Sequence, residues 1–248
     1  MKANAKQYSS TPNGDPHNSI YHFKIYLLNI SPMIYRRFKV KGDVHLATFH
    51  HLIQIIMGWD NIHLHCFKIW GLEYGMVDTG VTTFFDDPFK IFIADLDFRV
   101  GDKFEYNYDF GDDWEHEIRI EKIESINTKY KFPTCSEGMR ACPPEECGGP
   151  FFYEEALVEQ ERWQQFMLDK IRRSIREKKL PVIDNESMPL WYTNHQSEIF
   201  DRKKINKIIK KVYQENGDDN FWWKLKRYDP YKEDNLPIFC IKLSMWLI

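Results

Sequence analysis

Long apolar runs and a strong excess of either charge are both missing from this 248-residue sequence. No stretch reaches the roughly 18–20 apolar residues that a membrane-spanning helix needs, and the apolar segment 237–248 is interrupted by Lys242 and Ser244. The 34 Lys and Arg residues against 37 Asp and Glu residues give a formal net charge of −3. This balance excludes a general attraction to nucleic acid or to an anionic membrane. We therefore expect no membrane partner, and any basic surface must be local.

A disulfide framework is not indicated either, because the five Cys residues are odd in number. The first residues are polar and lack the apolar stretch of a secretory signal peptide. Thiols that stay reduced are typical of the cytoplasm. The sequence therefore predicts a cytoplasmic protein.

The composition that is present predicts a folded chain. Hydrophobic residues make up 43% and aromatic residues 16% of the sequence, which is enough apolar surface for a core. Residues 1–19 are polar, rich in turn-forming residues and expected to form a flexible tail. We expect one domain over 20–215, followed at 216–248 by an aromatic and apolar extension of unknown role.

Alternating apolar and polar residues, typical of half-buried strands, recur through the first half of the chain. They predict strands over 21–30, 34–40, 59–71 and 74–75, and a hairpin with strands over 104–108 and 114–120. The segment 131–150 holds three Cys, four Pro and three Gly and is predicted to be a loop without regular structure.

Apolar residues at helical spacing predict three helices. The first covers 48–57, with Thr48 as its N-cap and Gly58 just past its end. The other two cover 153–179 and 201–214, the last capped by Asp201. The expected fold is α+β: a mostly antiparallel sheet with one short helix early and two helices on the C-terminal side.

The predicted hairpin concentrates polar and aromatic side chains around an acidic turn at 109–113. Strand 34–40 adds two adjacent Arg residues, which point to opposite faces because side chains alternate along a strand. Only one of them can therefore face a given partner. The predicted binding cleft consists of Tyr108, Asp109, Asp112, Asp113, Trp114, His116, Arg36 and Arg37.

Histidines and carboxylates of this region form a candidate metal site. Imidazole and carboxylate groups are ligands of Zn²⁺ and of other divalent ions. The candidate ligands are His50, His63, His65 and His116, together with the Asp residues of the turn. Their spacing matches no ligand signature such as H-E-x-x-H. In the alternative interpretation, the Asp side chains bond backbone N–H groups of the turn and the His side chains bond across strands.

Cys135, Cys142 and Cys147 offer a second candidate metal site, of a structural kind. Six and four residues separate them, which is not the spacing of a zinc finger or ribbon, so a fourth ligand must come from elsewhere. The alternative is that these residues are buried thiols in a loop shaped by Pro and Gly.

The predicted C-terminal helices are basic at 172–179 and 202–211. Such clusters bind phosphate groups, and the aromatic residues that follow position 220 offer surfaces on which bases can stack. Nucleic acid is thus one candidate partner. The alternative is that these charged helix faces are simply solvated.

Five motifs in order resemble the plasmid pRiA-type ORF-three-like family, also labelled TnpR-like passenger proteins of insertion sequences. They are PMIYRR at 32–37, FHHLIQIIMGW at 49–59, NIHLHCF at 61–67, YNYDFGDDWEHEI at 106–118 and RACPPEECGGP at 140–150. The similarity is weaker at 191–206, and the segment from 217 onward lies outside it. The resemblance implies a compact α+β domain without an established reaction.

The leading hypothesis is a non-enzymatic binding or accessory module, associated with mobile DNA, whose partner is a protein or a nucleic acid. One alternative is a hydrolase that uses the His and Asp residues to hold Zn²⁺ or another divalent ion. The other is nucleic-acid binding through the basic helices. The recombinase chemistry that the TnpR label suggests has no support, since Ser31 is followed by Pro32 and lacks an activated-nucleophile context.

Overall fold

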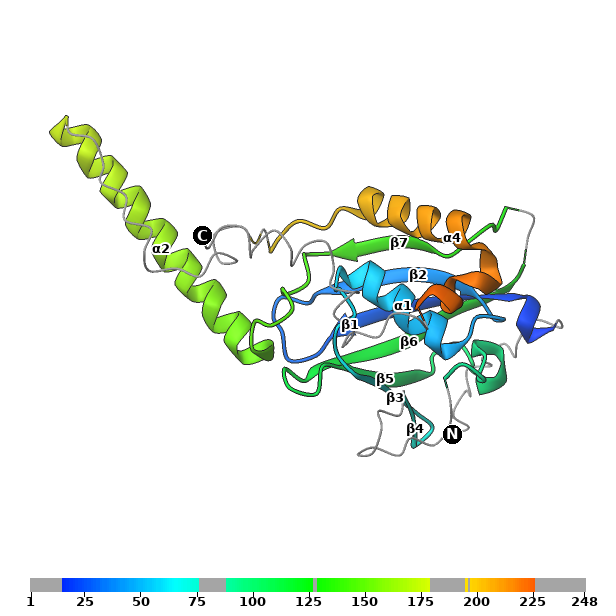
Figure 1. The fold of residues 1–248 in the computed structure, drawn as a ribbon. Coiled ribbons are helices and arrows are strands. Elements are labelled where there is room, and N and C mark those ends of the chain that lie inside the picture. Colours follow the sequence, from blue (N-terminus) through cyan, green and yellow to red (C-terminus); the bar gives the residue numbers. More distant parts are fainter. Residues whose placement is uncertain (1–14, 76–87, 127–128, 179–194, 196, 226–248) are drawn as a thin grey trace, which may run out of the picture.

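A computed structural model shows an antiparallel sheet with helices at one face and at one end (Figure 1). The structure describes residues 15–75, 88–126, 129–178, 195 and 197–225. Within them, seven strands pair in the order β4-β3-β5-β6-β1-β2-β7, and every strand pair is antiparallel. The predicted α+β class is confirmed.

The strands alternate buried and exposed side chains, as their sequences predict. One face carries the apolar set, including Phe23 and Ile25, and the other carries charged residues such as Lys24 and Arg37. The strands are β1 (Ser19–Leu27), β2 (Tyr35–Lys41), β3 (His65–Ile69), β4 (Leu72–Gly75), β5 (Lys103–Tyr108), β6 (Trp114–Ser125) and β7 (Thr134–Met139).

Helix α1 (Leu46–Met57) lies across the apolar face of the sheet and buries most of its length there (Figure 1). It ends at Gly58, whose φ of 90° is the left-handed conformation that glycine adopts at helix ends, as predicted. The predicted N-cap is wrong: the helix starts two residues earlier, His45 is the N-cap, and Thr48 is a buried residue within the first turn.

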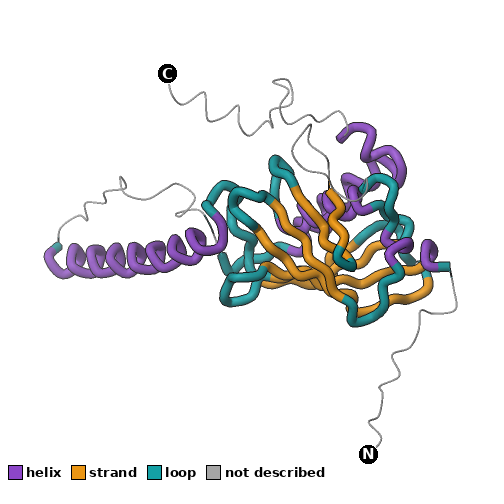
Figure 2. Tube along the Cα trace, turned by 90° about the horizontal axis from the view of Figure 1, so that it is seen from below, coloured by secondary structure: helices purple, strands orange, loops and turns teal. Residues whose placement is uncertain are grey.

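The two later helices have different settings (Figures 1 and 2). Helix α4 (Arg202–Leu225) packs against α1 and β7, at one edge of the sheet. Helix α2 (Gly149–Glu177) extends away from the sheet, and only its first residues reach the core. Two short 3₁₀ turns, η1 (Pro16–Asn18) and η2 (Ile93–Leu96), complete the described elements.

Further predicted boundaries are wrong, among them the following three. Residues 59–64 form a connection, and β3 begins only at His65, so His63 lies before the strand. The Cys-rich segment contains strand β7, because its backbone pairs with the exposed edge of β2 despite its Gly and Pro residues. Helix α4 continues beyond 214, past the predicted start of the extension at 216.

The predicted tail is described only from residue 15, and the part of the extension after 225 lies outside the described residues. None of the helices in the described ranges is both long enough and apolar enough to span a membrane.

Candidate functional site

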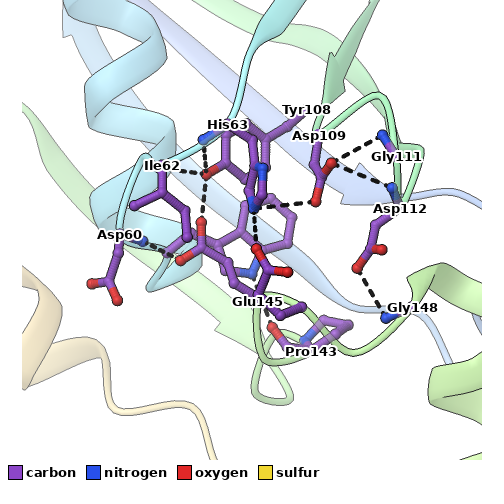
Figure 3. Close-up of polar contacts among 12 residues, drawn as sticks. Asp60, Ile62, His63, Tyr108, Asp109, Gly111, Asp112, Pro143, Glu145 and Gly148 are labelled. Carbon is purple, nitrogen blue, oxygen red and sulfur yellow. Dashed lines mark hydrogen bonds and ion pairs between the residues drawn. The ribbon is translucent and has the colours of Figure 1, made fainter. Parts of the chain in front are cut away.

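Three segments meet at the end of the central hairpin (Figure 3). They are the connection 59–64 after α1, the turn 109–113 between β5 and β6, and the loop 143–148 before α2. The loop is fixed from one side by the indole N–H of Trp59, which donates to the carbonyl of Pro143 at 2.9 Å. Segments more than 80 residues apart are thereby held together.

The hydroxyl group of Tyr108 is the central polar contact of these segments (Figure 3). It accepts the backbone N–H groups of Ile62 at 3.1 Å and His63 at 3.3 Å, and it donates to the carboxylate of Glu145. The other oxygen of Glu145 accepts the N–H of Asp60 at 2.7 Å. Burial raises the pKa of Glu145, and burial together with this carboxylate raises the pKa of Tyr108.

The two carboxylate oxygens of Asp109 have different roles: one caps the turn and the other faces the site. Its Oδ1 accepts the N–H groups of Gly111 at 3.0 Å and Asp112 at 3.3 Å, which is the turn-capping role that the alternative interpretation assigned to it. Its Oδ2 faces His63 at 3.4 Å. The φ of Asp109 is 58°, a strained conformation that these bonds hold in place.

Asp112 connects the hairpin to the start of α2. Its Oδ2 accepts the N–H of Gly148 at 3.0 Å. The next residue, Gly149, lies so close that an added Cβ would be 2.3 Å from the carbonyl oxygen of Asp112, and its φ is 83°. Only glycine fits this position, so the turn and the loop approach each other at backbone distance.

His63, Asp109 and Glu146 place one ligand atom each within 4.8 Å of one another. The Nε2 atom of His63 lies 2.6 Å from Oε1 of Glu146 and 3.4 Å from Oδ2 of Asp109. That nitrogen is buried, and neither carboxylate is aligned to form a hydrogen bond with it. In the described part of the chain this is the one group of three or more such side chains whose geometry suits a metal ion.

The other three candidate histidines form a buried layer around Tyr106. The Nδ1 atom of His50 forms a hydrogen bond with the Tyr106 hydroxyl group at 2.8 Å, and its Nε2 atom forms one with Oδ1 of Asn61 at 2.6 Å. The ring of His65 stacks on that of His50 at 3.4 Å. His116 contacts the Tyr106 carbonyl through Nδ1 at 3.1 Å.

Burial keeps this layer neutral, because a charged imidazole is poorly solvated in the core. It lowers the pKa of His50 to about 3 and that of His116 to about 4. It also lowers the pKa of His65 well below its usual range. The structure therefore brings His63 together with Asp109, and places His50, His65 and His116 in hydrogen-bonded or stacked positions of the core.

The remaining predicted cleft residues lie apart from this group. Trp114 is fully buried, and Asp113 turns back to accept the side-chain N–H of Asn107 at 2.6 Å. Arg36 and Arg37 point to opposite faces of the sheet, as predicted.

Arg36 is buried and donates to the carbonyl groups of Ile56 at 3.0 Å and Met139 at 2.9 Å, so it joins the end of α1 to the end of β7. Its guanidinium also lies over the ring of Phe200, 4.0 Å from the centroid. Arg37 pairs on the outer face with two carboxylates, Glu121 and Glu137.

The three predicted cysteine ligands are buried as free thiols at separate places. Cys135 lies in β7, Cys142 accepts from Arg36 at 3.2 Å, and Cys147 lies next to Glu146. Burial raises the pKa of Cys135 to about 11 and that of Cys147 to about 12, which favours the protonated form. No three Cys ligand atoms converge within the described ranges.

The sequence-based prediction did not include Glu145 and Glu146 among the site residues. Their signal was present: two adjacent carboxylates stand between a Pro pair and a Gly pair, in a loop too rigid to be a simple linker. Glu146 has a φ of 62°, so its backbone lies in the left-handed region that non-glycine residues rarely adopt.

Comparison with known proteins returns relatives of uncharacterised function. The chain is 34% identical over 142 residues to the uncharacterized protein y4hQ of Sinorhizobium fredii, covering 55% of this chain and 71% of that protein. It is also similar to a solved structure, a protein of unknown function, MM3350, from Methanosarcina mazei Go1. That similarity has a TM-score of 0.53 and 25% sequence identity, and it covers 75% of this chain and 97% of the other.

A family model described as plasmid pRiA4b ORF-3-like protein matches residues 19–178. The matched range starts with β1 and runs through the hairpin, the loop 143–148 and helix α2. It therefore includes every residue of the His63, Asp109 and Glu146 group. The chain belongs to the plasmid pRiA4b ORF-3-like protein family.

Proposed function

We propose that this protein is a binding module whose site holds one divalent metal ion between His63, Asp109 and Glu146. The observation that carries the proposal is the buried Nε2 atom of His63, which faces two carboxylates without a hydrogen bond to either. One imidazole and two carboxylates suit Mn²⁺ or Zn²⁺. Ligand atoms about 2.1 Å from a tetrahedral ion lie about 3.4 Å apart. The separation of His63 and Asp109 matches this at 3.4 Å, whereas the exposed Glu146 side chain, 2.6 Å from His63, has to turn outward to bind the ion.

Three protein ligands leave coordination positions for water or for a bound molecule. Around them, Asp109 is fixed by the turn and the loop is fixed by Asp112, so two of the three segments are preorganised. The Glu146 side chain is 65% exposed and remains accessible from solvent. An accessory role in mobile DNA, which the family resemblance implies, is compatible with such a module and is part of the same proposal.

A second candidate function is metal-dependent hydrolysis, and the contact between Tyr108 and Glu145 favours it. This pair lies directly beside the proposed ligands, since Tyr108 precedes Asp109 and Glu145 precedes Glu146. A metal-bound water is a nucleophile near neutral pH, and an adjacent carboxyl group can exchange its proton. Turnover that requires the metal and is lost in Glu145→Gln would establish this function over simple binding.

The proposal is tested by titrating metal-free protein, prepared without a His tag, with Mn²⁺ and with Zn²⁺ by calorimetry. We expect one equivalent to bind, with His63→Ala weakening the affinity at least a hundredfold, beyond the roughly 10- to 100-fold typical of outer-shell residues. Glu146→Gln, which keeps the shape of the side chain, should also weaken it.

The matched control is His22→Ala. His22 contacts Glu124 at 3.0 Å on the outer, charged face of the sheet, so it offers a His–Glu contact without a third ligand. This variant should bind metal as the wild type does. The absence of binding in the wild type, or equal loss in His22→Ala and His63→Ala, would overturn the proposal.

A further inference from the structure

Helix α4 presents a basic face in its first three turns. Its first part reads RKKINKIIKK over 202–211, with six basic residues and no acidic one. None of Arg202, Lys203, Lys204, Lys207 and Lys210 forms an ion pair with a carboxylate in the described part of the chain.

On the sheet, by contrast, several basic residues are paired with carboxylates. Arg37 contacts Glu121 and Glu137, and both Lys103 and Arg119 contact Glu117. The whole chain is slightly acidic, with a formal net charge of −3. The run 202–211 therefore forms a local positive surface on a chain whose overall charge is slightly negative.

The opposite face of α4 fixes the helix to the sheet. Ile209 is fully buried, and the side-chain amide of Asn206 pairs with the backbone of Cys135 in both directions, at 2.8 Å and 2.9 Å. The N-terminus is capped by Asp201, which accepts the N–H of Lys204 at 2.9 Å. The basic side chains thus project from a rigid helix whose orientation is set by the sheet edge.

The spacing of the basic residues follows the helix axis. Lys203, Lys207 and Lys210 are separated by four and three residues, so they share one stripe and lie about 6 Å and about 4.5 Å apart along it. Each strand of a duplex carries one phosphate per about 3.4 Å of axis, so the stripe covers about three phosphate steps. The aromatic residues of this helix begin only at Tyr213, beyond the basic run, so the run itself offers charge without a stacking surface, which favours a duplex over a single strand.

We propose that the basic face of α4 binds the phosphodiester backbone of double-helical nucleic acid, independently of base sequence. Each neutralised phosphate contributes about −0.9 to the slope of log affinity against log salt. Four contacts then reduce the affinity about a hundredfold between 50 and 200 mM salt. The site is separate from the His63 group, so either proposal can fail without the other.

The experiment measures fluorescence anisotropy of a labelled 30-base-pair DNA duplex with the full chain over 50–200 mM NaCl. Parallel arms use an RNA duplex and single-stranded DNA of the same length, which identify the source of the phosphodiester. The variant K203Q/K207Q/K210Q should lower the salt slope by about 3 and the affinity at least tenfold. The variant K203R/K207R/K210R should keep both.

The matched control is K68Q/K103Q/K122Q, which removes the same charge from exposed strand residues. Circular dichroism checks that each variant is folded. The proposal is overturned if the wild type does not bind duplex at 50 mM salt, if the two Gln variants lose affinity equally, or if the protein binds anionic vesicles and no nucleic acid.

Discussion

This protein should unfold at a higher pH on acidification than its carboxylates alone would require. The reason is that the buried histidine layer must stay neutral in the folded state. The pKa is about 3 for His50 and about 4 for His116 in the folded protein, against about 6.5 for an unfolded-state imidazole. Below about pH 6.5 the unfolded chain therefore binds protons that the folded chain excludes. The stabilisation is complete above this pH and is lost as the pH falls.

The size of the effect follows from these values. At pH 5.0, protonation of one unfolded-state imidazole lowers the free energy of unfolding by about 2 kcal/mol relative to pH 7.5. His50 and His116 together contribute about 4 kcal/mol, and the slope below pH 6 is about 2.7 kcal/mol per pH unit. His65 shifts in the same direction. This is a large part of the 5–15 kcal/mol that stabilises a typical domain.

The assay is urea unfolding at pH 5.0, 6.0, 7.0 and 7.5, followed by the fluorescence of the eight Trp residues. In His116→Gln, about 2 kcal/mol of the loss between pH 7.5 and 5.0 should disappear. The matched control is Ile118→Val, two residues along the same strand, which should cost about 1 kcal/mol equally at every pH. A wild-type stability that changes by less than 1 kcal/mol over this range, or an unchanged pH slope in His116→Gln, would refute the reasoning.

Two further predictions concern single residues that join segments. Arg36→Met should lower the free energy of unfolding in urea by about 3 kcal/mol or more, because it leaves buried carbonyl groups unpaired. Arg37→Met, which breaks ion pairs on the outer face, should lower it by less than about 1 kcal/mol. Similar losses in the two variants would contradict this. Gly149→Ala should lower the free energy of unfolding by about 3 kcal/mol and weaken metal binding, because the added Cβ meets the carbonyl group of Asp112. In the control Gly58→Ala the added Cβ meets open space, so the free energy of unfolding should fall by only about 1 kcal/mol and metal binding should stay intact. Metal affinity that survives in Gly149→Ala would show that the close approach does not support the site.

The sequence predicted the elements with strong periodicity and the hairpin at the centre of the sheet. It placed strand β3 too early, because the alternation of residues 59–64 resembles that of a strand. In the fold this connection gives its backbone N–H groups to Tyr108 and Glu145 and has no strand partner there. It missed β7 because Gly and Pro suggested a loop, while the free edge of β2 decided otherwise.

By itself, the sequence determined the α+β class, the side-chain alternation that directs Arg36 and Arg37 to opposite faces, and the basic run of α4, since these depend on local periodicity and composition. Only the tertiary structure decided which histidine meets which carboxylate. His63 and Glu146 are 83 positions apart (146 − 63) and meet because Asp112, Gly149 and Tyr108 hold two loops against one turn. Local patterns carry no information on such a contact, because its geometry depends on the packing of segments distant in the chain.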